Sequence, residues 1–391
     1  QEEHTPSNAP VLYDTPRDMA SAMKLPQASK WLEAYLAERQ QLKTLAVYEV
    51  VELPAGTHNK TPHVLKSKVV FKVKYLGNGD LDKFKCRIVC TGYNMIFGEQ
   101  YRETFAPVAS ISTIRIFLAW AIQMNMYTRC IDISGAYCKA DMDEEYVIYM
   151  YPPKGCEEGV GPNGRPNVWK LRKYLYGLKS SGWAWHRKLY SYLLSIGFKP
   201  CPQDPCLLQR VTQEGIITVV TYVDDLPHCA TSEELLTWFE AAMRKEFGSL
   251  TATDLDWVLG ISIDYDRDAG TCTMTQKQYI EDQCRALGLE HEPAVATPAL
   301  ANFSADPPTD ETALTPAEQK QYMSIIGGLN YVQKQTRLDV AAIISILAQF
   351  LSRASKAHMK QAKRVWVYLR DTADHTITYR RQDAATANVP L

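Results

Sequence analysis

The sequence predicts an α+β protein in which a small antiparallel sheet is backed by helices. Three observations lead to this class. Strand-like runs at 69–75 and 84–90 flank the turn sequence Gly-Asn-Gly-Asp, as in a β-hairpin. A β-branched run at 216–223 ends close to two aspartates, where a second hairpin would turn. Stretches of helical length with apolar periodicity lie between and after these strands.

The first half of the chain alternates between helical and extended patterns. Residues 1–28 contain Pro and Ser without periodicity and are expected to form a loosely held leader. Helices are predicted at 30–45, 114–124 and 183–194, extended runs at 48–54 and 127–133, and a long Gly- and Pro-rich loop at 152–164. The apolar side chains expected to face the core from the first helix are Leu32, Tyr35, Leu36, Leu42 and Leu45.

The second half is predicted to end in helices. A helix is expected at 233–247, followed by strands around 257–263 and 271–275. The Pro-rich stretch at 293–316 is the best candidate for a linker, and three helical segments follow at 319–332, 340–351 and 356–369. Because 391 residues exceed one ordinary core, we expect three regions: 1–42, 43–250 and 251–391.

Composition narrows the class of protein. The chain is 46% hydrophobic and 22% charged, which is typical of globular proteins. It contains no apolar run of about 18 residues, so no membrane partner is expected, and its first residues, Gln-Glu-Glu-His, do not form a secretory signal. The ten Cys include no C-x-x-C pair, so zinc binding is poorly supported and reduced thiols of an intracellular protein are expected.

Three carboxylates stand at the ends of predicted strands. Asp132 closes the strand at 127–133, and Asp224 with Asp225 follows the run at 216–223. Carboxylates projecting together from one sheet are suited to hold a pair of Mg²⁺ ions for an in-line phosphoryl displacement. Taken alone, an Asp-Asp pair more often only forms a tight turn.

A series of motifs accompanies these carboxylates. In chain order they are KCRIVCTGY at 85–93, ETFAPV at 103–108, TIR at 113–115, DISGAY at 132–137, LYGLK at 175–179, YVDDL at 222–226 and TRLD at 336–339. Together they resemble the reverse transcriptase of copia-type LTR retrotransposons over nearly the whole chain. The resemblance implies a right-hand polymerase fold, with fingers and palm in 43–250 and a thumb or connection region in 251–391.

The resemblance also implies roles for individual residues. Asp132, Asp224 and Asp225 would be catalytic and would hold two Mg²⁺ ions, with Mn²⁺ as an alternative and the carbonyl of Ile133 as an extra ligand. The residues implied to bind the incoming dNTP are Lys85, Arg87, Tyr137 and Ser180. Those implied to contact the template-primer are Lys179, Tyr222, Trp257 and Gly260. From the residues alone, a solvated hairpin face (Lys85, Arg87) and core aromatics (Tyr137, Trp257) stay open as alternatives.

Three departures from the family pattern bear on activity. Ser180 replaces the usual Gln, Pro227 stands in the strand after the catalytic pair, and Leu338 replaces a usual Pro. A proline in a strand removes a ladder hydrogen bond and is tolerated mainly at an edge or a bulge. The leading hypothesis is therefore an RNA-directed DNA polymerase, and the alternative is a degenerate or domesticated polymerase fold that binds nucleic acid without catalysis.

The charge distribution favours a nucleic-acid partner although the formal net charge is only -1. Basic residues outnumber acidic ones by eight to two at 60–87, by eight to none at 159–203 and by six to none at 340–370. The expected partners are an RNA or DNA template with its primer, dNTPs, the RNase H and integrase modules of Pol, and a Gag particle. No RNase H module is expected within this chain. The implied location is the cytoplasm, in a virus-like particle, or the nucleus.

Overall fold

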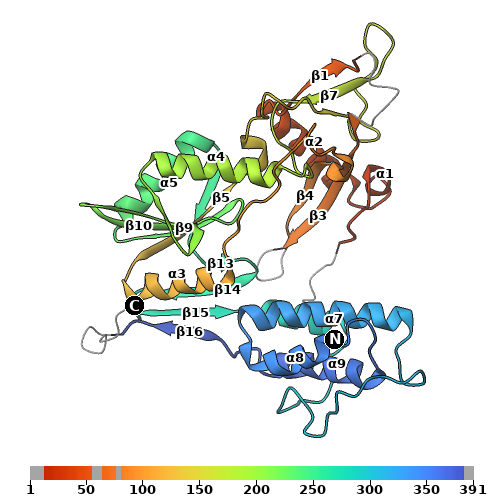
Figure 1. Ribbon diagram of the computed structural model, residues 1–391, viewed down its shortest axis with the longest axis vertical. Helices are drawn as coiled ribbons and strands as arrows, with labels where there is room; N and C mark the ends of the chain where they lie inside the picture. Colours follow the sequence, from red (N-terminus) through yellow and green to blue (C-terminus); the bar gives the residue numbers. More distant parts are fainter. Residues whose placement is uncertain (1–12, 55–63, 76–80, 383–391) are drawn as a thin grey trace, which may run out of the picture. The chain divides into compact units, whose positions relative to one another are not determined.

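The computed structural model describes residues 13–54, 64–75 and 81–382, and it divides into two compact units (Figure 1). Unit 1 comprises residues up to Val108, then Ile133–Lys199 and Phe247–Leu250. Unit 2 comprises Ala109–Asp132, Pro200–Glu246 and the residues from Thr251 onwards. Mostly antiparallel sheets and separate helices confirm the α+β class. The predicted fingers and palm, 43–250, contribute to both units, and the naming of these regions stays a prediction.

A hairpin backed by a helix forms the first part of unit 1. Strands β3 (Ser67–Tyr75) and β4 (Leu81–Cys90) pair antiparallel, and helix α2 (Ala28–Thr44) packs against them after the short α1 (Met19–Ala22). The Trp31 ring lies 5.1 Å from Phe71 and 4.5 Å from Phe84 between ring centroids. The turn predicted at 77–80 lies outside the described residues.

The buried face of α2 differs from the expected one. Trp31, Tyr35 and Leu42 are buried, whereas Leu32 and Leu36 are exposed. Glu38 occupies the remaining position of the buried stripe, because the spacing 31, 35, 38, 42 follows one side of a helix. The prediction of Leu32 and Leu36 as core residues is therefore wrong, since the large Trp31 ring decides which side faces the hairpin.

The rest of unit 1 consists of a four-stranded sheet and further helical turns. The strand order is β1 (Tyr48–Glu52), β7 (Asn167–Leu171), β6 (Tyr149–Met150) and β2 (Val64–Leu65). The helical segments are η1 (Gly92–Asn94), η2 (Ala136–Lys139) and α4 (Ser181–Ser195).

A six-stranded sheet forms the first part of unit 2. Its order is β12 (Leu250–Thr253), β5 (Tyr127–Ile133), β11 (Asp225–Ala230), β10 (Gly215–Val220), β9 (Asp204–Thr212) and β8 (Lys199–Cys201). Helix α3 (Ile111–Gln123) shares a core cluster with Cys229 of β11. Helix α5 (Glu233–Phe247) covers the opposite face, where the rings of Phe239 and His228 lie 5.0 Å apart.

A second sheet and four helices complete unit 2. The sheet order is β13 (Trp257–Val258), β14 (Ile261–Asp266), β15 (Thr271–Thr275) and β16 (Ile377–Arg380). The helices are α6 (Lys277–Ala286), α7 (Pro316–Gln335), α8 (Ala341–Ala348) and α9 (Lys356–Asp371), with η3 (Leu338–Val340) between α7 and α8. In this part of the molecule, as in the rest of the described chain, no helix has the length and apolar character needed to cross a bilayer.

The Pro-rich stretch at 293–316 is packed within unit 2. The Gln361 side chain of α9 donates to the carbonyl of Pro298 at 2.7 Å and accepts from the Leu300 N–H at 3.3 Å. Phe303 packs against the helical core. Because both neighbouring segments belong to the same unit, the prediction of a linker here is wrong.

Candidate functional site

The carboxylates Asp132 and Asp225 face each other across two central strands. In the antiparallel register of β5 and β11 they are direct partners, and Cys130 is the partner of Pro227 two residues further along. Directly opposed side chains in such a pair lie about 5 Å apart at Cβ and on the same face of the sheet. The fold therefore brings together two of the three carboxylates singled out from the sequence.

Asp224 occupies the turn of the β10–β11 hairpin. Tyr222 and Asp225 exchange two backbone hydrogen bonds of 3.0 Å, which leaves Val223 and Asp224 as the two turn residues. Val223 has a φ of 56°, a left-handed conformation that is unfavourable for a β-branched side chain. The turn thus stores strain at the point where the chain presents the acidic pair.

Pro227 lies inside the six-stranded sheet. The β10–β11 pairing runs from Ile217↔Ala230 to Val219↔His228, so Pro227 falls just beyond its last pair. On its other side Pro227 pairs with Cys130 of β5. The missing N–H is accommodated because the ladder is interrupted at this position, as expected for a proline at an irregular point of a strand.

Carboxylate oxygens on facing strands suit a hard cation such as Mg²⁺. Proteins usually hold Mg²⁺ through one or two carboxylates together with substrate phosphates. Within residues 13–54, 64–75 and 81–382, no three His, Cys, Asp or Glu side chains gather into a ready-made metal site. The donor set of Asp132 and Asp225 thus fits an ion that the substrate helps to hold. Asp224 and the carbonyl of Ile133 stay predicted ligands.

Asp256 is a fourth carboxylate, missed in the sequence, whose negative charge adds to those of Asp132 and Asp225 at Cys130. Burial, together with the charges of Asp225, Asp132 and Asp256, raises the pKa of the Cys130 thiol to about 12. Cys130 therefore stays protonated at neutral pH. Asp256 immediately precedes the predicted primer hairpin at Trp257, and only that adjacency pointed to it in the sequence.

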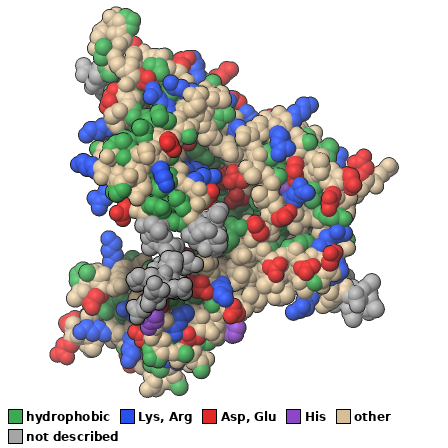
Figure 2. All heavy atoms as spheres, turned by 180° about the vertical axis from the view of Figure 1, so that it is seen from behind, with side chains coloured by type: hydrophobic (Ala, Val, Ile, Leu, Met, Phe, Trp, Pro, Cys, Tyr) green, Lys and Arg blue, Asp and Glu red, His purple; other side chains and the backbone are tan. Residues whose placement is uncertain are grey.

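The β3–β4 hairpin, which is predicted to belong to the fingers, carries a dense basic face. Cys86 and Ile88 are buried, so Lys85 and Arg87 share the opposite face of β4. The register pairs Lys72 with Lys85 and Lys74 with Lys83 directly across the strands. Like charges in direct opposition destabilise a sheet, so this face is suited to bind an anion. Figure 2 shows Lys and Arg side chains exposed over unit 1.

Glu38 is a half-buried counter-charge beside this hairpin. It accepts the Ile88 N–H at 3.2 Å. Burial raises the pKa of Glu38, although the Ile88 N–H and the charges of Arg87 and Lys85 oppose this shift. An acidic residue on the apolar stripe of α2 was the feature in the sequence that could have identified it.

The residues predicted to contact the dNTP and the template are only partly accessible. Tyr137 is half-buried, with its ring centroid 4.9 Å from that of Tyr176. Ser180 is buried at 1% exposure, so it does not present a surface to a nucleotide in this conformation. The Lys179 ammonium donates to the Tyr101 hydroxyl at 3.1 Å.

The hairpin predicted to hold the primer is built on a two-residue turn. Val258 pairs with Ile261, and both Leu259 and Gly260 between them have positive φ values, 51° and 79°. The Tyr331 hydroxyl donates to the Leu259 carbonyl at 2.8 Å, and a Cβ at Gly260 would lie 2.0 Å from that hydroxyl. Glycine is therefore required here, and Trp257 remains half-exposed beside the turn.

Some basic residues of the other two blocks form ion pairs within the protein. Five of the eight basic residues at 159–203 pair with acidic residues that are distant in sequence: Lys170 and Arg172 with Glu49, Lys173 and Lys188 with Asp141, and Arg187 with Asp143. In the block at 340–370, Arg353 pairs with Asp310 and Arg370 with Asp371. The expectation that these blocks face nucleic acid stays a prediction, and the dense basic face of the β3–β4 hairpin is its strongest support.

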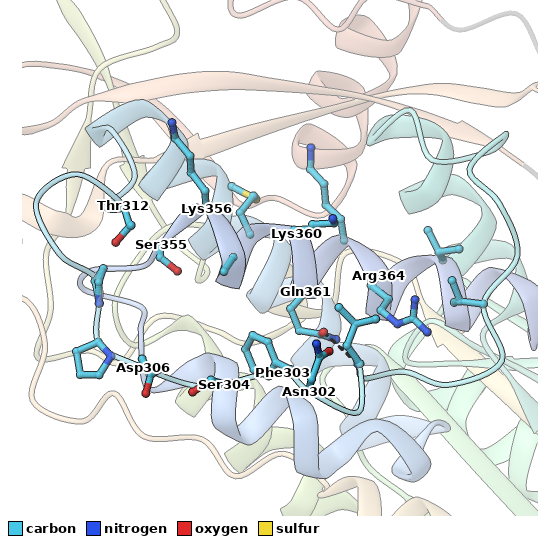
Figure 3. A pocket seen from close by; sticks show the side chains of 18 of the residues that line it. Asn302, Phe303, Ser304, Asp306, Thr312, Ser355, Lys356, Lys360, Gln361 and Arg364 are labelled. Atoms are coloured by element: carbon cyan, nitrogen blue, oxygen red, sulfur yellow. Dashed lines mark hydrogen bonds between the residues drawn. The ribbon is translucent and has the colours of Figure 1, made fainter.

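A separate cavity of about 1180 Å³ lies between α9 and the segment 289–312 (Figure 3). In Figure 3, Lys356 and Lys360 extend from α9, while Phe303 and Asn302 lie near Gln361. None of the carboxylates described above lines it. The cavity is therefore distinct from the candidate chemical site.

Comparison with known proteins shows which proteins this chain is similar to. The model of the family described as reverse transcriptase (RNA-dependent DNA polymerase) matches residues 45–301. The Pol polyprotein of transposon TNT 1-94 from Nicotiana tabacum is 28% identical over 94% of this chain, and that of transposon RE1 from Arabidopsis thaliana is 31% identical over 80%. The chain spans only 27% and 20% of the length of these two relatives.

A solved structure of the foamy viral protease-reverse transcriptase in complex with double-stranded DNA is also similar. It matches 97% of this chain and 54% of its own at 12% identity, with a TM-score of 0.46, which is too low to argue from. The matches to transposon Pol polyproteins confirm the resemblance seen in the motifs. Because the family model covers more than half of its length, this chain belongs to the reverse transcriptase (RNA-dependent DNA polymerase) family.

Proposed function

We propose that this chain is the polymerase region of a copia-type retrotransposon Pol polyprotein. It would extend a primer on an RNA or DNA template by adding deoxynucleoside monophosphates and releasing pyrophosphate. The observation that carries this proposal is the direct pairing of Asp132 with Asp225 at the end of β11, next to Asp224 in the hairpin turn. Two like charges in direct opposition are stable when a divalent cation lies between them.

Residues of both units have roles in the proposal. Mg²⁺ ions bound at these carboxylates would supply activation of the primer 3′-oxygen and stabilisation of the leaving group. Asp132 and Asp225 would hold the metal ions. Arg87 and Lys85 would bind the triphosphate, Arg87 through the planar fork of donors on its guanidinium. The Tyr137 ring, placed under the sugar, excludes a ribose 2′-hydroxyl.

Primer extension on an RNA template with dNTPs and Mg²⁺ tests the proposal. Extension is expected to require the metal and to fall by a factor on the order of 10² or more in Asp132→Asn, Asp224→Asn and Asp225→Asn. Asp264→Asn serves as the matched control, because Asp264 is an exposed carboxylate of β14 in the same unit. Absence of extension by the folded wild type, or equal loss in the control, would refute the proposal.

A degenerate or domesticated polymerase fold that binds nucleic acid without catalysis is the second candidate. Pro227 within an interior strand and the burial of Ser180 favour it. It predicts duplex binding that weakens steeply with salt while primer extension is absent. The same preparations distinguish the two candidates.

The remaining partners are also proposals. Similarity to Pol polyproteins supports association with RNase H and integrase modules. Assembly with a Gag particle, and a location in a cytoplasmic virus-like particle or in the nucleus, follow from the resemblance to copia-type elements.

A further inference from the structure

Three side chains of unit 1 form a continuous stack. The guanidinium carbon of Arg87, on β4, lies 4.5 Å from the ring centroid of Tyr176. The Tyr176 ring also lies 4.9 Å from the ring of Tyr137, with the planes inclined by 55°. All three side chains are half-buried, so the stack borders solvent. Tyr176 thus contacts both residues to which the proposed function gives nucleotide contacts.

The backbone that carries Tyr176 is fixed against the end of β4. The Tyr176 carbonyl accepts the Cys90 N–H at 2.8 Å. Gly177 has a φ of 92°, and a Cβ there would lie 2.0 Å from the Cys90 carbonyl oxygen. A Cβ at Gly92 would lie 2.1 Å from the Gly177 carbonyl oxygen. Two glycines therefore permit an approach that no other residue allows, and this approach holds the Tyr176 ring close to Arg87.

We propose that Tyr176 is a positioning residue of the nucleotide site. Its ring orients the Arg87 guanidinium and supports the Tyr137 ring, so one side chain controls both the grip on the triphosphate and the discrimination between deoxyribose and ribose. This inference rests on the proposed polymerase function and gives an individual role to Tyr176, which lies in the LYGLK motif at 175–179.

The physical basis is the loss of freedom that the stack imposes on both neighbours. A guanidinium within about 6 Å of an aromatic centroid is attracted to the ring face, and this attraction limits the conformations that Arg87 samples. Aromatic neighbours at this separation likewise prefer one inclined arrangement. Without the Tyr176 ring, Arg87 must be ordered by the nucleotide itself, which weakens binding, and Tyr137 can shift away from an incoming 2′-hydroxyl.

Single-nucleotide incorporation by Tyr176→Leu and Tyr176→Phe, compared with wild type, tests this role. For Tyr176→Leu we expect the KM for dNTP to rise about 5- to 30-fold with kcat changed by less than about threefold, and the preference for dNTP over rNTP to fall about tenfold. Tyr176→Phe keeps the ring and is expected to stay within about twofold of wild type for each quantity. A purely structural role would lower stability without changing the sugar preference.

Trp238→Leu provides the matched control. It removes a similar contact in unit 2, where the Arg210 guanidinium carbon lies 4.3 Å from the Trp238 ring centroid, and it is expected to leave both quantities unchanged. The inference would be overturned if Tyr176→Leu and wild type had the same preference for dNTP over rNTP. It would also be overturned if Tyr176→Phe lost as much of that preference as Tyr176→Leu.

Nucleotide binding to the template-primer complex in Ca²⁺ gives a second measurement that needs no turnover. Weaker dNTP binding by Tyr176→Leu than by wild type supports the inference. Equal binding overturns the role of Tyr176 and leaves the proposed polymerase function standing. A wild type that neither binds nor incorporates nucleotide overturns the proposed function, and the inference with it.

Discussion

Replacing Arg337 by Met should destabilise the helical part of unit 2 far more than the same change at a surface arginine. The Arg337 side chain is 2% exposed and forms a two-pronged ion pair with Asp339, at 3.0 and 2.8 Å. It also donates to the Thr372 carbonyl at 2.9 Å and to the Thr372 hydroxyl at 2.6 Å. This one guanidinium therefore joins the start of η3 to the C-terminal end of α9.

The expected loss of stability in Arg337→Met depends on the Asp339 carboxylate that is left without its partner. Removing one partner of a buried ion pair costs about 3–5 kcal/mol, because the other charge loses its compensation. The Asp339 side chain is 38% exposed and recovers some hydration, so we expect the lower part of that range, about 3 kcal/mol. For Arg353→Met, whose partner Asp310 is fully exposed, we expect about 0–1 kcal/mol.

Hydrogen–deuterium exchange of the α9 amides measures this difference. A loss of about 3 kcal/mol corresponds to exchange on the order of 100-fold faster for amides that open with the helical cluster. Arg337→Lys keeps the charge but loses the forked geometry, so it should lie between Met and wild type. If Arg337→Met and Arg353→Met accelerate exchange equally, the reasoning from burial is refuted.

Two further predictions concern unit 1. Gly177→Ala should lower the free energy of unfolding in urea by about 2–4 kcal/mol, because it adds a clash with the Cys90 carbonyl to the strain of a positive φ. Gly155→Ala, with φ 84° and open space at Cβ, should lower it by only about 1–2 kcal/mol. Equal losses in the two variants would contradict the clash. Burial raises the folded-state pKa of Glu38 above its usual 4.5. The wild type should therefore lose stability relative to Glu38→Gln as the pH rises above 4.5. Urea unfolding between pH 4 and 7 measures this slope, and a slope of opposite sign would contradict a raised pKa for Glu38.

Elements with a strong local pattern were predicted closely. The strand at 127–133 lies at Tyr127–Ile133 and the helix at 233–247 at Glu233–Phe247. In contrast, β16 was not predicted, because four residues carry little pattern and its pairing of Arg380 with Thr271 joins distant parts of the chain. Sequence periodicity reveals local secondary structure, but it does not reveal which distant segments pair.

The candidate site shows the same division. The expectation that strand-end carboxylates meet on one sheet agrees with the pairing of Asp132 and Asp225. The role of Tyr176 was not evident, because it depends on a contact with β4 that no local pattern contains. Charge counting along the chain also leaves out long-range ion pairs, since Glu49 and Asp141 pair with basic residues far from them in sequence.

The way in which the two units share the chain has a consequence for biosynthesis. The chain passes between the units five times, and unit 1 receives its last segment only at Phe247–Leu250. During translation, unit 1 therefore cannot be completed until well over half of the chain has left the ribosome, by which time most of the six-stranded sheet has also been synthesised. No single truncation point separates the units, so limited proteolysis between them should release fragments that remain associated rather than two independent folded domains.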